Sequence, residues 1–438
     1  MSNFQQVDFF TDLSLVDDPY PYFEYLRSLG PVCRLPHRNV VAVTGYGEAI
    51  AVYNDGKTFS SVNAVTGPIP DLPFRVESAD IGAQIDQFRP QFPMGGQIVT
   101  LDGVHHSATR SLLMRLLTPT RLKDNEQFLW HLANQQIDQF IERGHCELLS
   151  EYASPYATLV IANLLGVPEE DRNLFHEQLA AAPAQIDADP EKAAAVPLMF
   201  LMDYFRQYVG ERLRDPRKDV LTELTTVKFP DGSTPTAENI AWLAAFLFGA
   251  GQDTTARLLP ASMRILGERP DLQELLRQEQ HRIPDFIEEV LRIDSPVKCN
   301  FRLARVPTTV GGLDIQPGTT IAIFIGAANR DPRRFECPTE FRLDRPKAKE
   351  HLGFGRGAHT CAGAPLARAE VRVSLERLLD RLGDIRVSEE MHGPSGARRY
   401  SYEPTYLLRG LQQLHLNFTP SPGKYLPQKL DSALHGGL

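Results

Sequence analysis

Leu352-Gly-Phe-Gly-Arg-Gly-Ala-His-Thr-Cys-Ala-Gly-Ala-Pro-Leu-Ala-Arg-Ala-Glu370 is the stretch of this chain that is most informative about its fold. Its three alternate glycines permit backbone conformations and close approaches that a Cβ would forbid. Apolar residues then recur at helical spacing from Val371 to Leu382. Cys361 is therefore expected in a tight loop at the start of an amphipathic helix, where loop amides and the helix dipole favour a thiolate. A stabilised thiolate is a metal ligand or a nucleophile.

Several local interpretations of this loop compete. A dinucleotide-binding fold would need a strand before the glycines, but Lys-Ala-Lys-Glu precedes them at residues 347–350. A zinc site would need further Cys or His residues at ligand spacing, and His359 with Cys361 supplies only an unsuitable pair. A Gly-rich turn around a buried structural cysteine stays open from the residues alone.

The pattern Phe-Gly-x-Gly-x-His-x-Cys-x-Gly, from Phe354 to Gly363, resembles the haem-binding loop of cytochrome P450 proteins. The pattern is long, and it rarely occurs by chance. The resemblance implies that Cys361 is the axial ligand of the iron in haem b (iron protoporphyrin IX). It also implies that Phe354, Gly355, His359 and Gly363 belong to the cofactor-binding loop.

Four further motifs of this family occur in the expected order along the chain. They are Asp102-x-x-x-His106-x-x-x-Arg110 with Leu117-Thr-Pro119, Ala250-Gly-Gln-Asp-Thr-Thr255, Glu289-Val-Leu-Arg292 with Ser295-Pro296, and Ala328-Asn-Arg-Asp-Pro332 with Phe335, Phe341 and Arg345. With the cysteine loop, five ordered matches leave little room for coincidence. The resemblance implies a mainly α-helical protein with small β-sheets, the cytochrome P450 fold, in a single large domain over residues 1–438.

Within that domain the resemblance places three parts. We expect a β-rich N-terminal part at about residues 30–60, a helical core at about 100–300 and the haem-thiolate loop at 352–363. Local patterns point the same way, because residues 33–35 and 39–44 alternate like two short strands.

Two segments are expected to cover a substrate. From residue 60 to 97 the pattern dissolves into Gly, Pro and isolated apolar residues, which predicts a long loop. In the family this loop covers the substrate, although a tolerated surface insertion would look the same. Residues 178–200 are Ala-rich and interrupted by prolines, and by resemblance they form a lid.

Composition limits the possible partners and compartment. The chain has 438 residues, 42% of them hydrophobic, and a net charge of −9 without a run of like charges, which argues against a nucleic-acid partner. Its five cysteines are scattered and odd in number, which suits reduced thiols in a cytoplasm. Residues 1–16 lack the pattern of a signal or anchor, and the longest uncharged run, residues 152–168, falls short of the roughly 20 residues that span a bilayer. We expect no membrane anchor.

Residues 240–251 are apolar on nearly every face, so their helix is expected to pass through the middle of the fold. Asp253 and Thr254 follow directly, and buried polar groups are costly unless they are paired. One interpretation is a helix-internal bond from the threonine hydroxyl to a carbonyl four residues back. By resemblance, Ala250 and Gly251 open a groove over the haem, while Asp253 and Thr254 act on dioxygen and its protons.

Glu289 and Arg292 are three residues apart and share one helix face, with Arg345 as the third charge that the family suggests. An exposed surface pair is the alternative for this motif taken alone. By resemblance the role is structural and not catalytic.

Haem carries two propionates, which must be neutralised if they are buried, and each charge-assisted hydrogen bond contributes roughly 1.5–3 kcal/mol. The candidate partners are His106, Arg110, Arg302 and His359. One departure from the family concerns His106. Bacterial members usually have two prolines before this histidine, where the present chain has Gly103 and Val104.

The resemblance implies a bacterial haem-thiolate monooxygenase that uses dioxygen to hydroxylate an apolar small molecule such as a terpenoid, steroid or fatty acid. Electron donation by the thiolate favours cleavage of the O–O bond. The chain has no flavin or iron–sulfur motif, so electrons should come from a ferredoxin or similar small redox protein with its reductase. A peroxide-driven enzyme and a non-enzymatic haem sensor or carrier are the alternatives, and neither would need Asp253 and Thr254.

Overall fold

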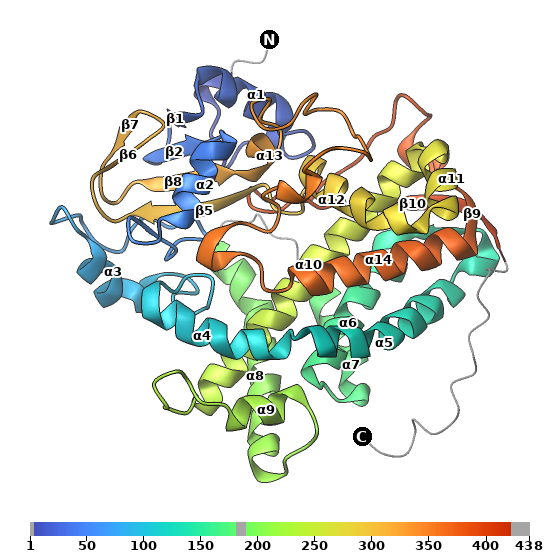
Figure 1. Cartoon of the computed structure of the whole chain (residues 1–438), viewed down its shortest axis with the longest axis horizontal. Coiled ribbons are helices and arrows are strands. Elements are labelled where there is room, and N and C mark those ends of the chain that lie inside the picture. Colours follow the sequence, from blue (N-terminus) through green and yellow to red (C-terminus); the bar gives the residue numbers. More distant parts are fainter. Residues whose placement is uncertain (1–3, 181–189, 422–438) are drawn as a thin grey trace.

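Helix α10 (Ala237–Glu268) runs through the centre of the computed structural model, which describes residues 4–180 and 190–421 (Figure 1). The helix begins at a capping box, in which the Thr236 hydroxyl accepts from the backbone N of Asn239 at 3.1 Å and the Asn239 side chain accepts from the backbone N of Thr236 at 3.1 Å. Buried residues such as Phe248 pack it against its neighbours on several sides. This central position is the one that the apolar run at 240–251 predicts.

The protein is mainly helical with small sheets, as predicted. The helices are α1 (Tyr20–Leu29), α2 (Tyr46–Asn54), α3 (Gly82–Phe88), α4 (Gly103–Leu116), α5 (Pro119–Asp138), α6 (Ser154–Leu165), α7 (Glu169–Ala180), α8 (Pro190–Arg214), α9 (Val220–Thr226), α10, α11 (Pro270–Gln278), α12 (Ile283–Ile293), α13 (Ile325–Ala328), α14 (Ala364–Arg381) and α15 (Glu389–His392). Helix α10 packs on α6, α8 and α14, and α14 packs in turn on α5 and α12.

In the part of the chain that the structure describes, the strands form three small sheets. They are β1 (Val32–Arg34), β2 (Val40–Val43), β3 (Phe59–Ser60), β4 (His145–Glu147), β5 (Cys299–Ala304), β6 (Thr308–Val310), β7 (Leu313–Ile315), β8 (Thr320–Phe324), β9 (Leu382–Val387) and β10 (His415–Pro420). The largest sheet has the order β1-β2-β8-β5-β3, and only its β2–β8 pair is parallel. The other sheets are β4-β10-β9 and the hairpin β6-β7.

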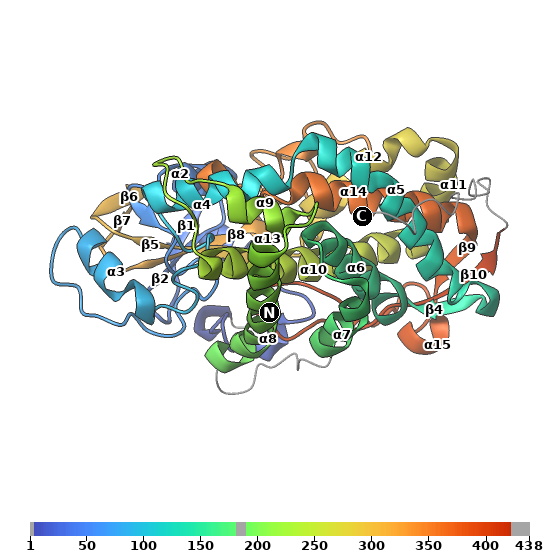
Figure 2. The same ribbon diagram turned by 90° about the horizontal axis from the view of Figure 1, so that it is seen from below.

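The large sheet lies at one end of the molecule and most of the helices lie at the other (Figures 1 and 2). One hydrophobic core joins the helices, while two smaller cores lie against the sheet. The segment before α14 crosses between the two parts, and so does β5 with the residues before it (Figure 1). Functional side chains carried by these connections therefore meet between sheet and helices.

The prediction of a long loop at residues 60–97 is partly wrong, because α3 and a short 3-10 helix at Arg89–Gln91 form within this segment. The Asp80 carboxylate accepts from the backbone N of Gly82 at 2.8 Å, which satisfies one amide at the start of α3. Ile85 is then buried in a small separate hydrophobic cluster. Scattered apolar residues gave no helical period over so short a segment, so the sequence did not show this helix.

The predicted lid at residues 178–200 falls partly outside the described residues, since α7 ends at Ala180 and α8 begins at Pro190. Among the helices that the structure describes, none combines the length and apolar character needed to cross a membrane.

Candidate active site

A cavity of about 290 Å³ lies between the sheet and the helices. Its wall contains the residues that the sequence assigned to cofactor binding, which are His106, Arg110, Ala250, Gly251, Arg302, Phe354, Gly355, His359, Cys361 and Gly363. They come from α4, α10, β5 and the loop before α14. The fold thus brings together segments that are separated by up to about 250 positions in the sequence.

The loop that carries Cys361 is fixed by backbone contacts. The backbone N of Cys361 donates to the carbonyl of Phe354 at 2.8 Å and closes the loop on itself. Gly355 and Gly357 have φ values of +65° and +71°, a region that side-chain-bearing residues rarely adopt. A Cβ on Gly357 would also lie 2.5 Å from the carbonyl oxygen of Tyr53. The glycines therefore let the loop lie directly against α2.

The loop amides favour the Cys361 thiolate as expected, but burial outweighs them in the protein by itself. Burial raises the pKa of the Cys361 thiol, and this effect outweighs the opposing effects of the Gly363 amide and the Arg110 guanidinium. The exposed surface of Cys361 faces the cavity, so it is accessible there although protein surrounds the sulfur. Burial cannot be seen in a local motif. A bound cation would offset the cost of burial, because a coordinated thiol is deprotonated.

Four cationic or titratable side chains crowd one end of the cavity. The rings of His106 and His359 lie 3.9 Å apart between centroids, and burial with the nearby Arg302, His106 and Arg110 lowers the pKa of His359 to about 2. The Nε2 of His106 is buried without a hydrogen-bond partner. Arg302 is buried, and its guanidinium donates to the carbonyl of Phe301 at 2.6 Å. Among the described residues, no carboxylate forms an ion pair with Arg302.

These features fit haem. An unpartnered imidazole nitrogen and a buried guanidinium without a carboxylate suit a ligand that brings its own carboxylates. One cysteine sulfur in the same cavity suits an iron with a single protein ligand. Within the described residues no group of three His, Cys, Asp or Glu side chains could hold a bare metal ion.

The structure separates the two residues expected to act on oxygen. Thr254 lines the cavity, and its hydroxyl donates to the carbonyl of Ala250 at 3.0 Å, which is the helix-internal bond considered above. Asp253 is not part of the cavity wall. Its Oδ1 instead lies 2.8 Å from Nη2 of Arg257, one turn further along α10.

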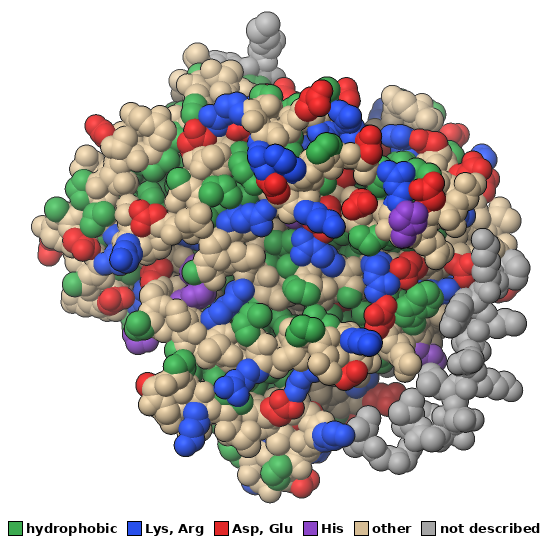
Figure 3. Space-filling model, in the orientation of Figure 1, with side chains coloured by type: hydrophobic (Ala, Val, Ile, Leu, Met, Phe, Trp, Pro, Cys, Tyr) green, Lys and Arg blue, Asp and Glu red, His purple; other side chains and the backbone are tan. Residues whose placement is uncertain are grey.

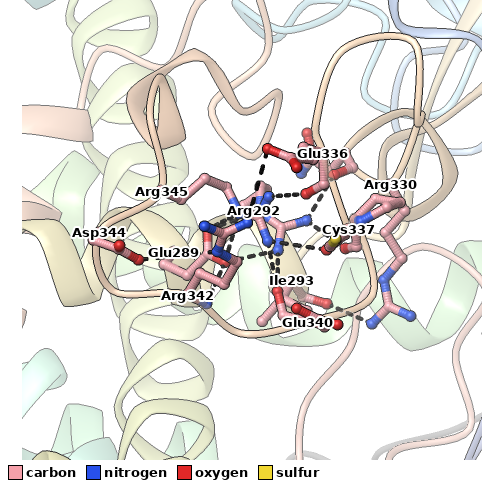
Figure 4. A network of polar contacts seen from close by, with 12 residues as sticks. Glu289, Arg292, Ile293, Arg330, Glu336, Cys337, Glu340, Arg342, Asp344 and Arg345 are labelled. Atoms are coloured by element: carbon pink, nitrogen blue, oxygen red, sulfur yellow. Dashed lines mark hydrogen bonds and ion pairs between the residues drawn. The ribbon is translucent and has the colours of Figure 1, made fainter.

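Glu289, Arg292 and Arg345 lie together in a buried network (Figure 4). The side chains of Glu289 and Arg292 have no exposed surface, and that of Arg345 is 2% exposed. Arg292 donates to both carboxylate oxygens of Glu289, at 2.7 and 2.8 Å, and Nε of Arg345 donates to the same group at 2.9 Å. The alternative interpretation of this motif as an exposed surface pair is therefore wrong for this chain.

Sequence reasoning gave no role to Glu370, the last residue of the opening stretch. Glu370 lines the cavity and is 2% exposed, and its Oε2 accepts from the hydroxyl of Thr255 at 2.7 Å. Burial raises the pKa of this carboxyl to about 8. The sequence feature that could have identified Glu370 is its position, because an acidic residue four positions after Leu366 lies on the apolar side of the helix.

A search of curated proteins finds that the chain is 32% identical to cytochrome P450 144 of Mycobacterium tuberculosis over 408 residues, which is 92% of this chain and 89% of that protein. The chain belongs to the cytochrome P450 family. The family model named Cytochrome P450 matches residues 173–383 of this P450. The five sequence motifs therefore identified the family correctly, and the enzyme is a member of a family of monooxygenases whose cofactor is haem iron.

Solved structures resemble this P450 over nearly its whole length. Substrate-free cytochrome P450 CYP150A6 of Mycobacterium marinum is 57% identical with a TM-score of 0.90, covering 95% of this chain and 100% of its own. CYP109E1 of Bacillus megaterium, solved in complex with corticosterone, is 26% identical with a TM-score of 0.78, covering 93% and 100%. These likenesses agree with the predicted P450 fold.

Proposed function

We propose that the protein binds haem b with Cys361 as the axial ligand and hydroxylates an apolar small molecule with dioxygen. The observation that carries the proposal is the single cavity that joins this cysteine, an anion-binding end at Arg302, His106 and His359, and the hydroxyl of Thr254. A haem-thiolate site needs all three features together, and each comes from a different part of the chain.

The cavity wall supports an apolar substrate. Beyond the cofactor end, the wall contains the aliphatic and aromatic side chains of Ile98, Val99, Phe246, Leu247 and Val297. Burying such surface against an apolar ligand contributes about 25 cal/mol per Å². The structural relative CYP109E1 was solved with corticosterone, which supports a molecule of the terpenoid, steroid or fatty-acid class here.

In the proposed mechanism the haem, when bound, supplies the reductive activation of dioxygen. The chain supplies position and protons. Arg302, Arg110 and His106 would hold the carboxylates of the cofactor, and burial of the Arg302 guanidinium strengthens its contact. Thr254 presents its hydroxyl to the cavity, and rotation of the hydroxyl away from the Ala250 carbonyl lets it donate a proton there while its oxygen accepts one. Asp253 would replenish that proton from the outer side of α10.

A small acidic redox protein, such as a ferredoxin with its reductase, is the proposed electron source. Lys and Arg side chains cross the middle of the face on which α14 and the loop before it lie (Figure 3). Arg115 and Lys123 are exposed and Arg356 is half-buried. Charges of this kind steer association and lose their effect as salt increases. The five free cysteines support a reducing compartment such as the cytoplasm.

The axial ligand is tested by the ferrous carbonyl spectrum. Cys361→Ser should abolish the strongly red-shifted Soret band, because a hydroxyl does not replace a thiolate as the iron ligand. Cys337→Ser changes an exposed cysteine outside the cavity wall and should keep the band. Survival of the band in Cys361→Ser would refute the assignment.

The reaction class is tested by product formation. With a reductase system the protein should form product, and with hydrogen peroxide alone it should form little. Thr254→Ala should continue to consume reductant but release much of it as hydrogen peroxide. Equal product from peroxide alone would favour the peroxide-driven alternative, and no product under either condition would favour a haem sensor or carrier.

A further inference from the structure

Asp253, Arg257 and Glu403 form a chain of ion pairs beside the cavity. Nη2 of Arg257 lies 2.8 Å from Oδ1 of Asp253, and Nε donates to the same oxygen at 3.1 Å. On its other side, Nη1 of Arg257 lies 2.6 Å from Oε2 of Glu403. The Arg257 side chain is 9% exposed, whereas that of Asp253 is 40% exposed. One buried guanidinium therefore holds two carboxylates that are 150 positions apart in the sequence.

The segment that carries Glu403 is built closely around this guanidinium. We call residues 402–411 the C-terminal turn. Tyr402 pairs with Leu411 in a β-bridge, and the backbone N of Glu403 donates to the carbonyl of Gly410 at 2.9 Å. A Cβ on Gly410 would lie 2.4 Å from Nη1 and 2.8 Å from Cγ of Arg257. The backbone of the turn thus lies directly on the Arg257 side chain, and only glycine permits this approach.

The C-terminal turn is also attached to the cavity wall. The backbone N of Arg409 donates to the carbonyl of Pro296 at 2.8 Å, and Val297 pairs with Leu408 in a β-bridge. Pro296 and Val297 both line the cavity. A ligand that packs against these two residues therefore presses on the backbone to which the turn is bound.

We propose that Arg257 is a positioning residue that couples the carboxylate of Asp253 to the C-terminal turn and, through it, to the substrate end of the cavity. The inference rests on the proposed role of Asp253 in proton delivery. A half-exposed aspartate has several accessible rotamers, and two N–H donors from one guanidinium select among them. Because Glu403 binds the same guanidinium, the position of the turn determines how Arg257 holds Asp253.

Product formation tests the coupling, with Asp253→Asn as the reference. Arg257→Met should slow product formation roughly 10-fold, since general acid assistance contributes about 10²–10⁴-fold and only its positioning is lost. Arg257→Lys keeps a cation and should restore most of the rate. Glu403→Gln should slow product formation roughly 2- to 5-fold, and it should add nothing in the Arg257→Met background because the two residues act through one contact.

Thermal unfolding supplies a readout that does not depend on turnover. Arg257→Met leaves Asp253 and Glu403 without their shared cation and should lower the melting temperature. Adding Glu403→Gln to Arg257→Met removes one of the two unpaired carboxylates and should recover part of that loss. The matched control is Glu268→Gln, also on α10, whose carboxylate pairs with Arg264 at 3.8 Å in the same i, i+4 spacing. It should leave product formation unchanged.

The outcomes separate this inference from the proposed function. If Asp253→Asn slows product formation while Arg257→Met and Glu403→Gln retain the wild-type rate, Arg257 does not position Asp253 and the inference is wrong. If the effects of Arg257→Met and Glu403→Gln are additive, the two residues do not act as one unit and the coupling is also wrong. If Asp253→Asn retains the wild-type rate, the proposed role of Asp253 itself fails.

Discussion

Replacing Glu289 by Gln should destabilise the protein more than removing one of the arginines that it binds. In the wild type the buried group contains one carboxylate and two guanidiniums, Arg292 and Arg345, so its net charge is +1. Glu289→Gln raises that buried charge to +2 and leaves neither cation compensated. Arg345→Met lowers it to zero, because Glu289 and Arg292 still form a neutral pair. The balance of buried charge therefore predicts that Glu289→Gln lowers the free energy of unfolding more than Arg345→Met does. A count of lost contacts alone does not predict this order.

The contacts set the magnitude. The Glu289 carboxylate accepts from Nε and Nη2 of Arg292, from Nε of Arg345, and from the backbone N of Arg342 at 2.9 Å. Breaking a buried pair by removing one partner costs roughly 3–5 kcal/mol. Arg345→Met loses the guanidinium contacts with the carbonyls of Glu336, Cys337 and Glu340, while Arg292 still donates to the Glu340 carbonyl and to Glu289. We expect its cost to be lower by about 2 kcal/mol, close to one charged hydrogen bond.

Urea unfolding of the haem-loaded protein measures the difference, with haem content recorded for each variant. Asp384→Asn is the matched control, because Asp384 pairs with Arg386 at 2.9 Å while both side chains are more than half exposed. Such a pair contributes about 0–1 kcal/mol. An unfolding free energy for Arg345→Met that is as low as that for Glu289→Gln would refute the charge argument, whatever the absolute values.

Three further outcomes follow from the cavity. Arg302→Met should weaken haem binding roughly 10- to 100-fold in a haem titration, because it removes buried charge-assisted hydrogen bonds to the cofactor. Gly357→Ala should lower haem occupancy, because the new Cβ would meet the Tyr53 carbonyl at 2.5 Å, whereas Gly210→Ala has open space in α8 and should stabilise by about 1 kcal/mol. Burial raises the pKa of Glu370 from 4.5 to about 8, so the unfolded chain releases this proton first. As pH rises from 4.5 to 8, the wild type should lose unfolding free energy relative to Glu370→Gln by up to about 1.4 kcal/mol per pH unit, measured by urea unfolding.

The cysteine loop could be predicted from sequence because its determinants are local. The positive φ values of Gly355 and Gly357 belong to the turn of the loop itself, and Cys361 follows at a fixed distance, whereas the approach of Gly357 to Tyr53 could not be read from the motif. The central helix could also be predicted from the sequence, since an apolar run followed by polar residues indicates a buried helix that reaches a site. Helix α3 was missed because it has only seven residues, too few for its apolar positions to show a helical period. Its buried residue Ile85 packs in a separate small cluster, which the sequence does not show.

The thiolate argument was incomplete for a different physical reason. Loop amides and a helix start do lower the pKa of Cys361, as the sequence suggested, but the cost of burial is larger. Desolvation depends on all the surrounding elements and not on the motif. Burial also raises the pKa of Glu370, and the sequence does not show how deeply that carboxyl is buried.

The relation between Asp253 and Thr254 shows what adjacency on a helix means. Consecutive residues of an α-helix project about 100° apart, so a residue that follows another on the helix need not face the same cavity. Thr254 takes the cavity side, and Asp253 takes the side on which Arg257 and the C-terminal turn lie. A proton that passes from Asp253 into the cavity must therefore cross the edge of α10, which requires the carboxylate to leave its rotamer or a water molecule to bridge it to the Thr254 hydroxyl. Because Arg257 holds that carboxylate in one rotamer, the ion pair favours the second route, in which a water molecule bridges a fixed Asp253 to the Thr254 hydroxyl, and loss of Arg257 is therefore expected to slow product formation.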